Sequence, residues 1–242
     1  PLGLLISASS TIGSGLNGGG LTVYGTATTT GTTTLATLGG FVGIGTSSPM
    51  SKLAISGGNI IQIASSSPVL KGTANTSGDA TDVYVSGKYA YVADDTAGLQ
   101  IVDISNPAAP VVEGTYNTAG NASDVHVSGK YAYVVDGGSG LHIIDVSNPT
   151  VPVLVGTYNP DSFISGVYIS GKYAYITDNI LGLQIIDISN PVSPSLVGTY
   201  DTSGIALGVY VSGKYAYVAD HTSGLHVVDV SNPASPSLMG TY

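Results

Sequence analysis

Short apolar runs, separated by Gly, Ser, Asn and Pro, recur along most of the chain. Four of them follow one another between residues 82 and 116, at Asp82 to Val85, Tyr89 to Val92, Leu99 to Ile104 and Val111 to Tyr116. Runs of about 4 to 8 residues that are rich in Val, Ile and Tyr and bounded by turn residues predict β-strands. Ser86-Gly87 predicts a hairpin between the first two strands. Pro110 has no N–H to donate, which excludes a central position for the strand that follows it.

This four-strand pattern repeats at a constant period. Lys88, Lys130, Lys172 and Lys214 occupy the same place in the phrase SGKYAY and lie 42 residues apart. Four strands in about 40–45 residues, without helical periodicity, are typical of a β-propeller blade. The third strand is apolar on both faces, as expected for a strand that is covered on both sides when blades stack. The pattern therefore predicts an all-β fold, a β-propeller of four-stranded blades over residues 66–242.

The predicted outer strands outnumber the other strands. The segment from Pro68 to Thr81 matches the segment from Pro110 to Ser123, and the fourth repeat has its own outer strand from Ser237 to Tyr242. Five outer strands thus serve four sets of the other three. If the four blades close into a ring, the extra strand near Val69 and Leu70 must pair elsewhere, for example on a neighbouring subunit. Otherwise the four blades form an arc or a piece of a longer propeller.

Residues 1–65 differ in composition from the repeats. They are rich in Gly, Thr and Ser, with brief strand-like runs at Leu21 to Tyr24, Thr32 to Leu38, Phe41 to Ile44, Lys52 to Ile55 and Asn59 to Ile63. Because Thr favours strands and the Thr tract is flanked by apolar residues, we expect a β-rich stalk segment. A flexible linker is the alternative. Leu4, Leu5 and Ile6 lie in an apolar opening segment that is long enough for one β-strand.

Two sequence motifs resemble known families. The phrases GLQIVDISNP, GLHIIDVSNP, GLQIIDISNP and GLHVVDVSNP, each preceded by YAYV or YAYI, resemble the LVIVD-repeat family of bacterial surface and secreted proteins over residues 68–242. This resemblance implies a β-propeller and says little about activity. The motif of residues 41–49 with Lys52 and Leu53 is similar to the VGIGT-x-SP element of phage tail fibres and bacterial surface fibres. That likeness favours a fibre context.

The charge of the chain limits its partners. Only 9% of residues are charged, compared with about 25% in an ordinary soluble domain, and the formal net charge is −9. All six basic residues are Lys, so we expect neither nucleic acid nor an anionic membrane as a partner. No apolar run approaches the ~18 residues of a membrane span. Such a weakly charged surface favours assembly with copies of the chain.

Because the sequence opens with Pro1, we expect any export signal to have been removed or to lie outside it.

The polar residues that recur in the repeats have structural interpretations. Two sets of Asp are candidates for a ring of cation-binding carboxylates, but an Asp before a turn more often stabilises that turn. The two sets are Asp103, Asp145, Asp187 and Asp229, and Asp94, Asp136, Asp178 and Asp220. His142 and His226 share a slot with Gln100 and Gln184, which we expect to supply a hydrogen bond between blades rather than a metal ligand. We expect no cofactor and no metal.

Catalytic motifs such as G-x-S-x-G, H-E-x-x-H and the P-loop are missing, so we expect no enzymatic activity. Asn75 and Asn121 fit the N-x-[ST] pattern for glycan attachment, a pattern that is common by chance.

These observations lead to two functional hypotheses. The first is an extracellular structural protein, a subunit of a bacterial surface fibre or filament, which polymerises with itself by β-strand addition through Leu4, Leu5 and Ile6 or through Val69 and Leu70. The second is an adhesion module on the cell surface that recognises a glycan or a protein through the propeller face. The second hypothesis rests on four turns that differ between repeats, at residues 95–97, 137–139, 179–181 and 221–223.

Overall fold

The computed structural model describes residues 42–44, 53–55 and 68–242, and the chain divides into two units, Pro1–Ser67 and Pro68–Tyr242. In the first unit, β1 (Val42–Ile44) pairs in parallel with β2 (Leu53–Ile55), and Val42 lies opposite Leu53. Both strands fall within runs that the sequence predicts as strands. The strands expected at 21–24, 32–38 and 59–63 lie outside the described residues.

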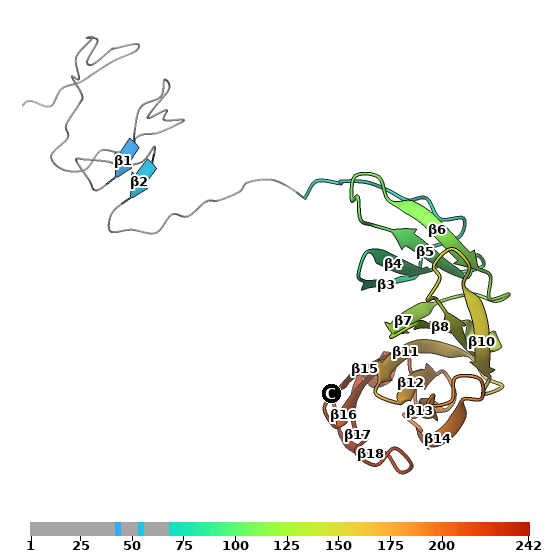
Figure 1. The fold of residues 1–242 in the computed structure, drawn as a ribbon. Coiled ribbons are helices and arrows are strands. Elements are labelled where there is room, and N and C mark those ends of the chain that lie inside the picture. Colours follow the sequence, from blue (N-terminus) through green and yellow to red (C-terminus); the bar gives the residue numbers. More distant parts are fainter. Residues whose placement is uncertain (1–41, 45–52, 56–67) are drawn as a thin grey trace, which may run out of the picture. The chain divides into compact units, whose positions relative to one another are not determined.

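The second unit consists of four antiparallel sheets of four strands each, which follow one another along the chain (Figure 1). We call these sheets blades 1 to 4. Blade 1 contains β3 (Asp82–Ser86), β4 (Tyr89–Ala93), β5 (Leu99–Asp103) and β6 (Val111–Tyr116). Blade 2 contains β7 (Asp124–Ser128), β8 (Tyr131–Val135), β9 (Leu141–Asp145) and β10 (Val153–Tyr158). Blade 3 contains β11 (Ile164–Ser170), β12 (Tyr173–Asp178), β13 (Gly182–Asp187) and β14 (Ser195–Tyr200). Blade 4 contains β15 (Gly208–Ser212), β16 (Tyr215–Ala219), β17 (Leu225–Asp229) and β18 (Ser237–Thr241).

The hairpin at the start of each blade follows directly from its sequence. In blade 1, Ser86 lies opposite Tyr89, so that Gly87 and Lys88 form a two-residue turn. Gly87 has a φ of 60°, which a residue without a side chain adopts at little cost. The same Ser-Gly-Lys turn joins the first two strands of the other three blades, which explains why this phrase is nearly identical in all four repeats.

The hydrophobic core lies between the blades. Each blade has a leading face, turned toward the preceding blade, and a trailing face, turned toward the next one. Tyr91, Leu99 and Ile101 on the trailing face of blade 1 pack against Val125 and Val127 on the leading face of blade 2. Equivalent clusters join blades 2 and 3 and blades 3 and 4. For the third strands of blades 2 and 3, this arrangement confirms the prediction that the strand is covered on both faces.

The four blades form an open arc (Figure 1). Their inner strands contact one another in the order β3, β7, β11, β15, and within residues 68–242 no comparable contact joins β15 to β3. The sequence left a closed ring, an arc and a piece of a longer propeller as alternatives, and the four blades of residues 68–242 do not close into a ring. In the described part of the chain, no helix is long and apolar enough to cross a membrane.

Candidate functional site: the leading segment and the end blades

The segment Pro68–Thr81, which we call the leading segment, lies against blade 1 without strand partners. It aligns with the outer strands of the blades, and its Gly72 occupies their Gly position. A Cβ on Gly72 would lie 2.4 Å from the carbonyl oxygen of Pro107, as a Cβ on Gly114 would lie 2.0 Å from that of Pro149. The leading segment therefore takes the place of the outer strand of a blade that would precede blade 1. Because no described strand lies beside it, it forms no sheet in this part of the chain.

Buried Asp side chains hold the connections between blades. Asp94 accepts hydrogen bonds from the Thr76 hydroxyl at 2.7 Å and from the Gly78 N–H at 2.8 Å. Asp220 accepts one from the Thr202 hydroxyl at 2.9 Å, and Asp178 accepts one from Ser162. The sequence suggested that these Asp residues stabilise the adjacent turns. Asp178 does so, since it accepts hydrogen bonds from the N–H groups of Ile180 and Leu181 at 2.8 and 2.9 Å. The bonds of Asp94 and Asp220, and the bond of Asp178 from Ser162, instead reach the connection that enters the same blade, 16 to 18 residues earlier in the chain.

The second set of Asp residues stabilises turns, as predicted. Asp103 accepts a hydrogen bond from the Ser105 N–H at 2.8 Å and forms an ion pair with Lys88 at 2.8 Å. These bonds, that from Lys88 foremost, lower the pKa of Asp103 to about 2. The Lys88 ammonium also lies 4.8 Å from the centre of the Tyr89 ring. Since the same ion pair recurs in blades 2 to 4 at 2.8 to 3.3 Å, these carboxylates are already neutralised by Lys and are poorly placed to bind a cation.

A line of aromatic side chains crosses the inner strands, one from each blade. Tyr84, His126, Tyr168 and Tyr210 follow one another with ring centres 4.6, 5.0 and 4.8 Å apart. We call this line the aromatic ladder. It gives adjacent blades a regular contact at their inner edge.

Carboxyl groups beside the ladder join three of the blades. Asp82 accepts a hydrogen bond from the N–H of Val125 at 3.1 Å, and Asp124 accepts one from the N–H of Val167 at 2.8 Å. Gly166 and Gly208 stand at the same position in blades 3 and 4, so this bond is missing from the joint between those blades. Burial first, and then the hydrogen bond to the Asp82 side chain, raise the pKa of Asp124 to about 7.

The repeat position shared by Gln and His is occupied by Gln in blades 1 and 3 and by His in blades 2 and 4. Gln184 receives a hydrogen bond from the Tyr158 hydroxyl of the preceding blade at 2.8 Å, which confirms the predicted bond between blades at this position. Gln100 instead donates to the Ala97 carbonyl oxygen of its own blade at 2.9 Å. In blades 2 and 4, the Nε2 atoms of His142 and His226 lie 3.7 and 3.4 Å from buried Asp carboxylates. Within the described residues, no three His, Cys, Asp or Glu side chains are close enough together to hold a metal ion.

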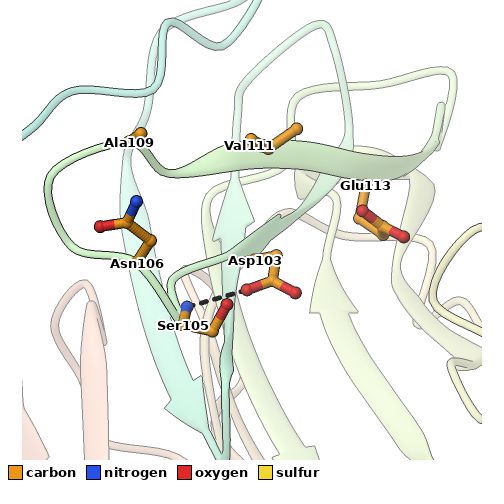
Figure 2. A pocket seen from close by; sticks show the side chains of 6 residues that line it. All are labelled: Asp103, Ser105, Asn106, Ala109, Val111 and Glu113. Carbon is orange, nitrogen blue, oxygen red and sulfur yellow. Dashed lines mark hydrogen bonds between the residues drawn. The ribbon is translucent and has the colours of Figure 1, made fainter.

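Shallow hollows lie beside the Ser-Asn-Pro turns of blades 1 and 2. Figure 2 shows the first, a hollow of about 300 Å³ between that turn and the start of β6, with the Ser105 N–H bound to Asp103. It is lined by Asp103, Ser105, Asn106, Ala109, Val111 and Glu113. The same positions of blade 2 line a hollow of about 440 Å³. Since both hollows arise from the same repeated turn, we interpret them as features of the blade rather than as a ligand site.

The predicted site residues fall into three groups. Leu4, Leu5 and Ile6 lie outside the described residues. Val69 and Leu70 lie in the leading segment, are exposed and belong to no strand. Asn75 and Asn121 are exposed, and the Asn121 amide donates a hydrogen bond to Asp95.

The exposed outer faces of the two end blades were not predicted from the sequence. Val83 and Val85 on the leading face of blade 1 are 56% and 58% exposed, whereas their equivalents Val125 and Val127 in blade 2 are 2% and 6% exposed. The aligned repeats contain the signal, because a face that is buried in blades 2 to 4 has the same apolar residues in blade 1. Finding it requires the knowledge that the arc is open, which the repeats do not contain.

The fold and its repeated joints define the class of protein. Four-stranded blades that stack through their faces make a β-propeller, and this repeat fold is that of a binding or structural module. Comparison with protein families agrees, since the LVIVD repeat is found at residues 77–118, 119–160, 164–202 and 203–242. The chain belongs to the LVIVD-repeat family.

Solved structures share the fold at low sequence identity. The computationally designed protein Ika4 has a TM-score of 0.56 and 7% identity over 67% of this chain and 98% of its own. The β-propeller domain of Cps50 (Swd1) from Myceliophteria thermophila has a TM-score of 0.56 and 12% identity over 67% of this chain. The designed protein Ika8 has a TM-score of 0.53 and 8% identity over 64% of this chain. The alignment spans 58% of the Cps50 domain and 46% of Ika8. No curated protein matches the sequence.

Proposed function

We propose that the protein is a non-catalytic structural subunit of a bacterial surface fibre, located outside the cell, which assembles with copies of itself by β-strand addition. One observation carries this proposal. The leading segment holds the position of an outer strand, with Gly72 against Pro107, but among the described residues it has no inner strands to pair with. A strand in this position is ready to complete a sheet in another molecule.

The repeat specifies how the leading segment would pair. In blade 4, Asp229 lies opposite Ser237 and Val228 lies opposite Leu238. Val69 and Leu70 occupy the repeat positions of Ser237 and Leu238, so the leading segment of one copy would place Val69 opposite Asp229 of another. Only one strand fits this edge, and β18 of the second copy would leave it. The exchange preserves the number of main-chain hydrogen bonds and therefore needs only a small difference between the two strands.

Exposure supports a role for the apolar residues of the leading segment. Leu70 is 77% exposed, whereas Leu154, Leu196 and Leu238 at the same repeat position, all in paired strands, are 37% to 48% exposed. Pairing would bury part of the Leu70 side chain at about 25 cal/mol per Å² of apolar surface.

Cysteine cross-linking tests the register, because the chain contains no Cys. A Val69→Cys chain is mixed with an Asp229→Cys chain under mild oxidation. We expect a disulfide-linked pair of chains on a non-reducing gel. The matched control replaces Asp229→Cys by Asp187→Cys, the same position in blade 3, where β14 is held at the edge because the chain continues from it into blade 4. Equal cross-linking to both positions, or none to Asp229→Cys, would contradict the strand-addition joint.

Electron microscopy tests the fibre itself. Negative-stain images of the purified full chain are expected to show filaments rather than isolated particles. Deleting residues 1–10 tests the other proposed donor, the segment of Leu4, Leu5 and Ile6. If that segment is the donor, the truncated chain retains its strand content in circular dichroism and forms no filaments. Filaments of normal length from the truncated chain would leave the leading segment as the donor.

A second candidate function is recognition of a glycan or a protein. It is favoured by exposed apolar side chains on the variable turn of blade 3, Ile180 and Leu181, and on the connections beside it, such as Phe163. The Asn179 N–H donates to the Phe163 carbonyl oxygen at 2.9 Å, which brings this turn and connection together. A glycan array probed with the full chain and with an Ile180→Ser, Leu181→Ser variant tests this function. Binding that is lost in the variant would support it, and no binding by either chain would count against glycan recognition.

A further inference from the structure

The two ends of the arc leave apolar faces uncovered. On the leading face of blade 1, the leading segment covers the outer part, where its Ala74 packs near Ala90, Val92 and Val102. Within residues 68–242 nothing covers the inner part, formed by Val83 and Val85, although the same positions are buried in blades 2 to 4 or nearly so.

The trailing face of blade 4 is uncovered in a corresponding way. Leu225 is 38% exposed, whereas Leu99, Leu141 and Leu183 at the same repeat position are completely buried by the next blade. Tyr210 at the end of the aromatic ladder is 60% exposed. Gly240, the equivalent of Gly114, has no carbonyl group of a following turn against it, and a Cβ there would meet only the Tyr242 ring at 3.9 Å.

These two faces are the two halves of a joint that the molecule already makes three times. In each interior joint, the trailing-face Tyr and Leu of one blade pack against the leading-face Val or Ile pair of the next. Blade 4 presents the first half of this joint, and blade 1 presents the second half. Resting on the proposed self-assembly, we propose that the trailing face of blade 4 docks on the leading face of blade 1 of a second copy of this chain, as a fourth joint of the same kind, in which the leading segment of the second copy takes the place of β18 against Pro107.

Two regularities of the stack would continue across this joint. The aromatic ladder ends at Tyr210 and begins at Tyr84, so that docking places these two rings next to each other at the spacing of about 5 Å seen inside the molecule. One repeat position is occupied by Gln in blades 1 and 3 and by His in blades 2 and 4, so that it alternates from Gln100 to His226. Blade 4 followed by blade 1 of the next copy keeps this alternation unbroken.

The proposed joint lacks one hydrogen bond that two of the interior joints have. The Asp of blades 1 and 2 that bonds to the following blade is replaced by Gly208 in blade 4, so this bond is missing from the proposed joint. The interior joint between blades 3 and 4 also lacks it, because Gly166 occupies the position there, and that joint is nevertheless buried. The proposed joint therefore resembles the joint between blades 3 and 4.

A joint between two different faces is head-to-tail, and repeating it produces either a closed ring or an open filament. Both assemblies use the same contact. The docking can therefore be tested separately from the proposed fibre.

The test uses two variants, each of which blocks one face. The first, Val83→Lys with Val85→Lys, blocks the leading face of blade 1. The second, Tyr210→Lys with Leu225→Lys, blocks the trailing face of blade 4. The control, Val151→Lys with Val192→Lys, changes two valines that are equally exposed on turns away from both faces. Circular dichroism and thermal melting confirm that each full-length variant folds, and analytical ultracentrifugation measures its mass.

We expect the wild type and the control to assemble, and each blocked variant alone to remain at the 24.2 kDa of one chain. A mixture of the two blocked variants retains one intact face of each kind. It should form dimers of one chain of each variant and nothing larger. Blocked variants that assemble like the wild type, or a wild type that remains monomeric, would overturn the docking.

The outcomes separate the docking from the fibre. Wild-type dimers of fixed size that both blocked variants abolish would support the docking and contradict the fibre. Filaments that neither blocked variant affects would support the fibre and overturn the docking.

Discussion

The interior joints and the end faces of this protein are built from the same residues but differ in what covers them. In an interior joint, such as that between blades 2 and 3, Leu141 and Ile143 on one face and Val167 and Ile169 on the other are buried. At the ends of the arc, within residues 68–242, the equivalents Val83 and Val85 are more than half exposed and Leu225 is 38% exposed. The comparison shows that exposure here depends on the place of a blade in the stack rather than on its composition. Substitutions at equivalent positions of an interior joint and an end face can test this conclusion.

The largest difference in unfolding free energy between an interior and an end substitution is expected for the Leu that follows the second turn of each blade. Leu183→Ala in an interior joint leaves a cavity in a completely buried cluster and should cost about 3 kcal/mol of unfolding free energy. Leu225→Ala at the end of the arc should cost about 1 kcal/mol in the monomer, because much of the side chain is already in water. Urea denaturation at low protein concentration measures both. Equal losses would mean that the end face is covered in solution.

A smaller effect is expected for the buried Asp residues that hold the connections between blades. Asp178 accepts bonds from Ser162, from Gln184 at 2.8 Å and from the N–H of Ile180 at 2.8 Å. Asp178→Ala leaves these donors unpaired inside the protein and should cost about 2 to 3 kcal/mol. Asp220→Ala in blade 4 removes the bond from Thr202 and should cost about 1 to 2 kcal/mol. Chemical denaturation measures the unfolding free energy of both variants. A larger loss of unfolding free energy in Asp220→Ala than in Asp178→Ala would contradict the assigned bonds.

The pH dependence of stability should depend on Asp124. Its pKa is raised in the folded state, so between about pH 4 and pH 7 the unfolded chain loses this proton first and stability falls as the pH rises. Asp124→Asn keeps an acceptor for the Val167 N–H but removes the charge. The variant should match the wild type near pH 4 and gain at least about 1 kcal/mol relative to it at pH 7.5. Denaturation curves of both chains across this range provide the difference, in which titrating groups that do not contact Asp124 cancel. A difference that does not change with pH would contradict the raised pKa.

The smallest effect is expected for the Lys and Asp pair at the hairpin turns. Lys172→Gln in blade 3 and Lys214→Gln in blade 4 both remove an ion pair in which the Lys is largely in solvent. Exposed ion pairs contribute little to stability. Both variants should therefore melt close to the wild type in differential scanning calorimetry, without a difference between interior and end. A clear loss in one variant alone would show that this turn takes part in a joint.

Much of the fold could be predicted because it depends on local patterns. The strands, the Ser-Gly-Lys hairpins and the blade period follow from residues that lie close together in the chain. The bond between the Ser105 N–H and Asp103 is also local, and it was predicted correctly. The role of Asp94 was not predicted correctly, because its partners Thr76 and Gly78 precede it by 18 and 16 residues, with two strands of a folded hairpin between.

The sequence by itself determined the blade: four strands with two apolar faces, copied four times, and an additional outer strand in the leading segment. The arc, whose first and last faces are uncovered within residues 68–242, emerged from the tertiary structure alone. The physical reason is that the contacts within a blade depend on the spacing of residues along the chain. Ring closure depends on the angle between neighbouring blades, which results from the packing of side chains from different repeats.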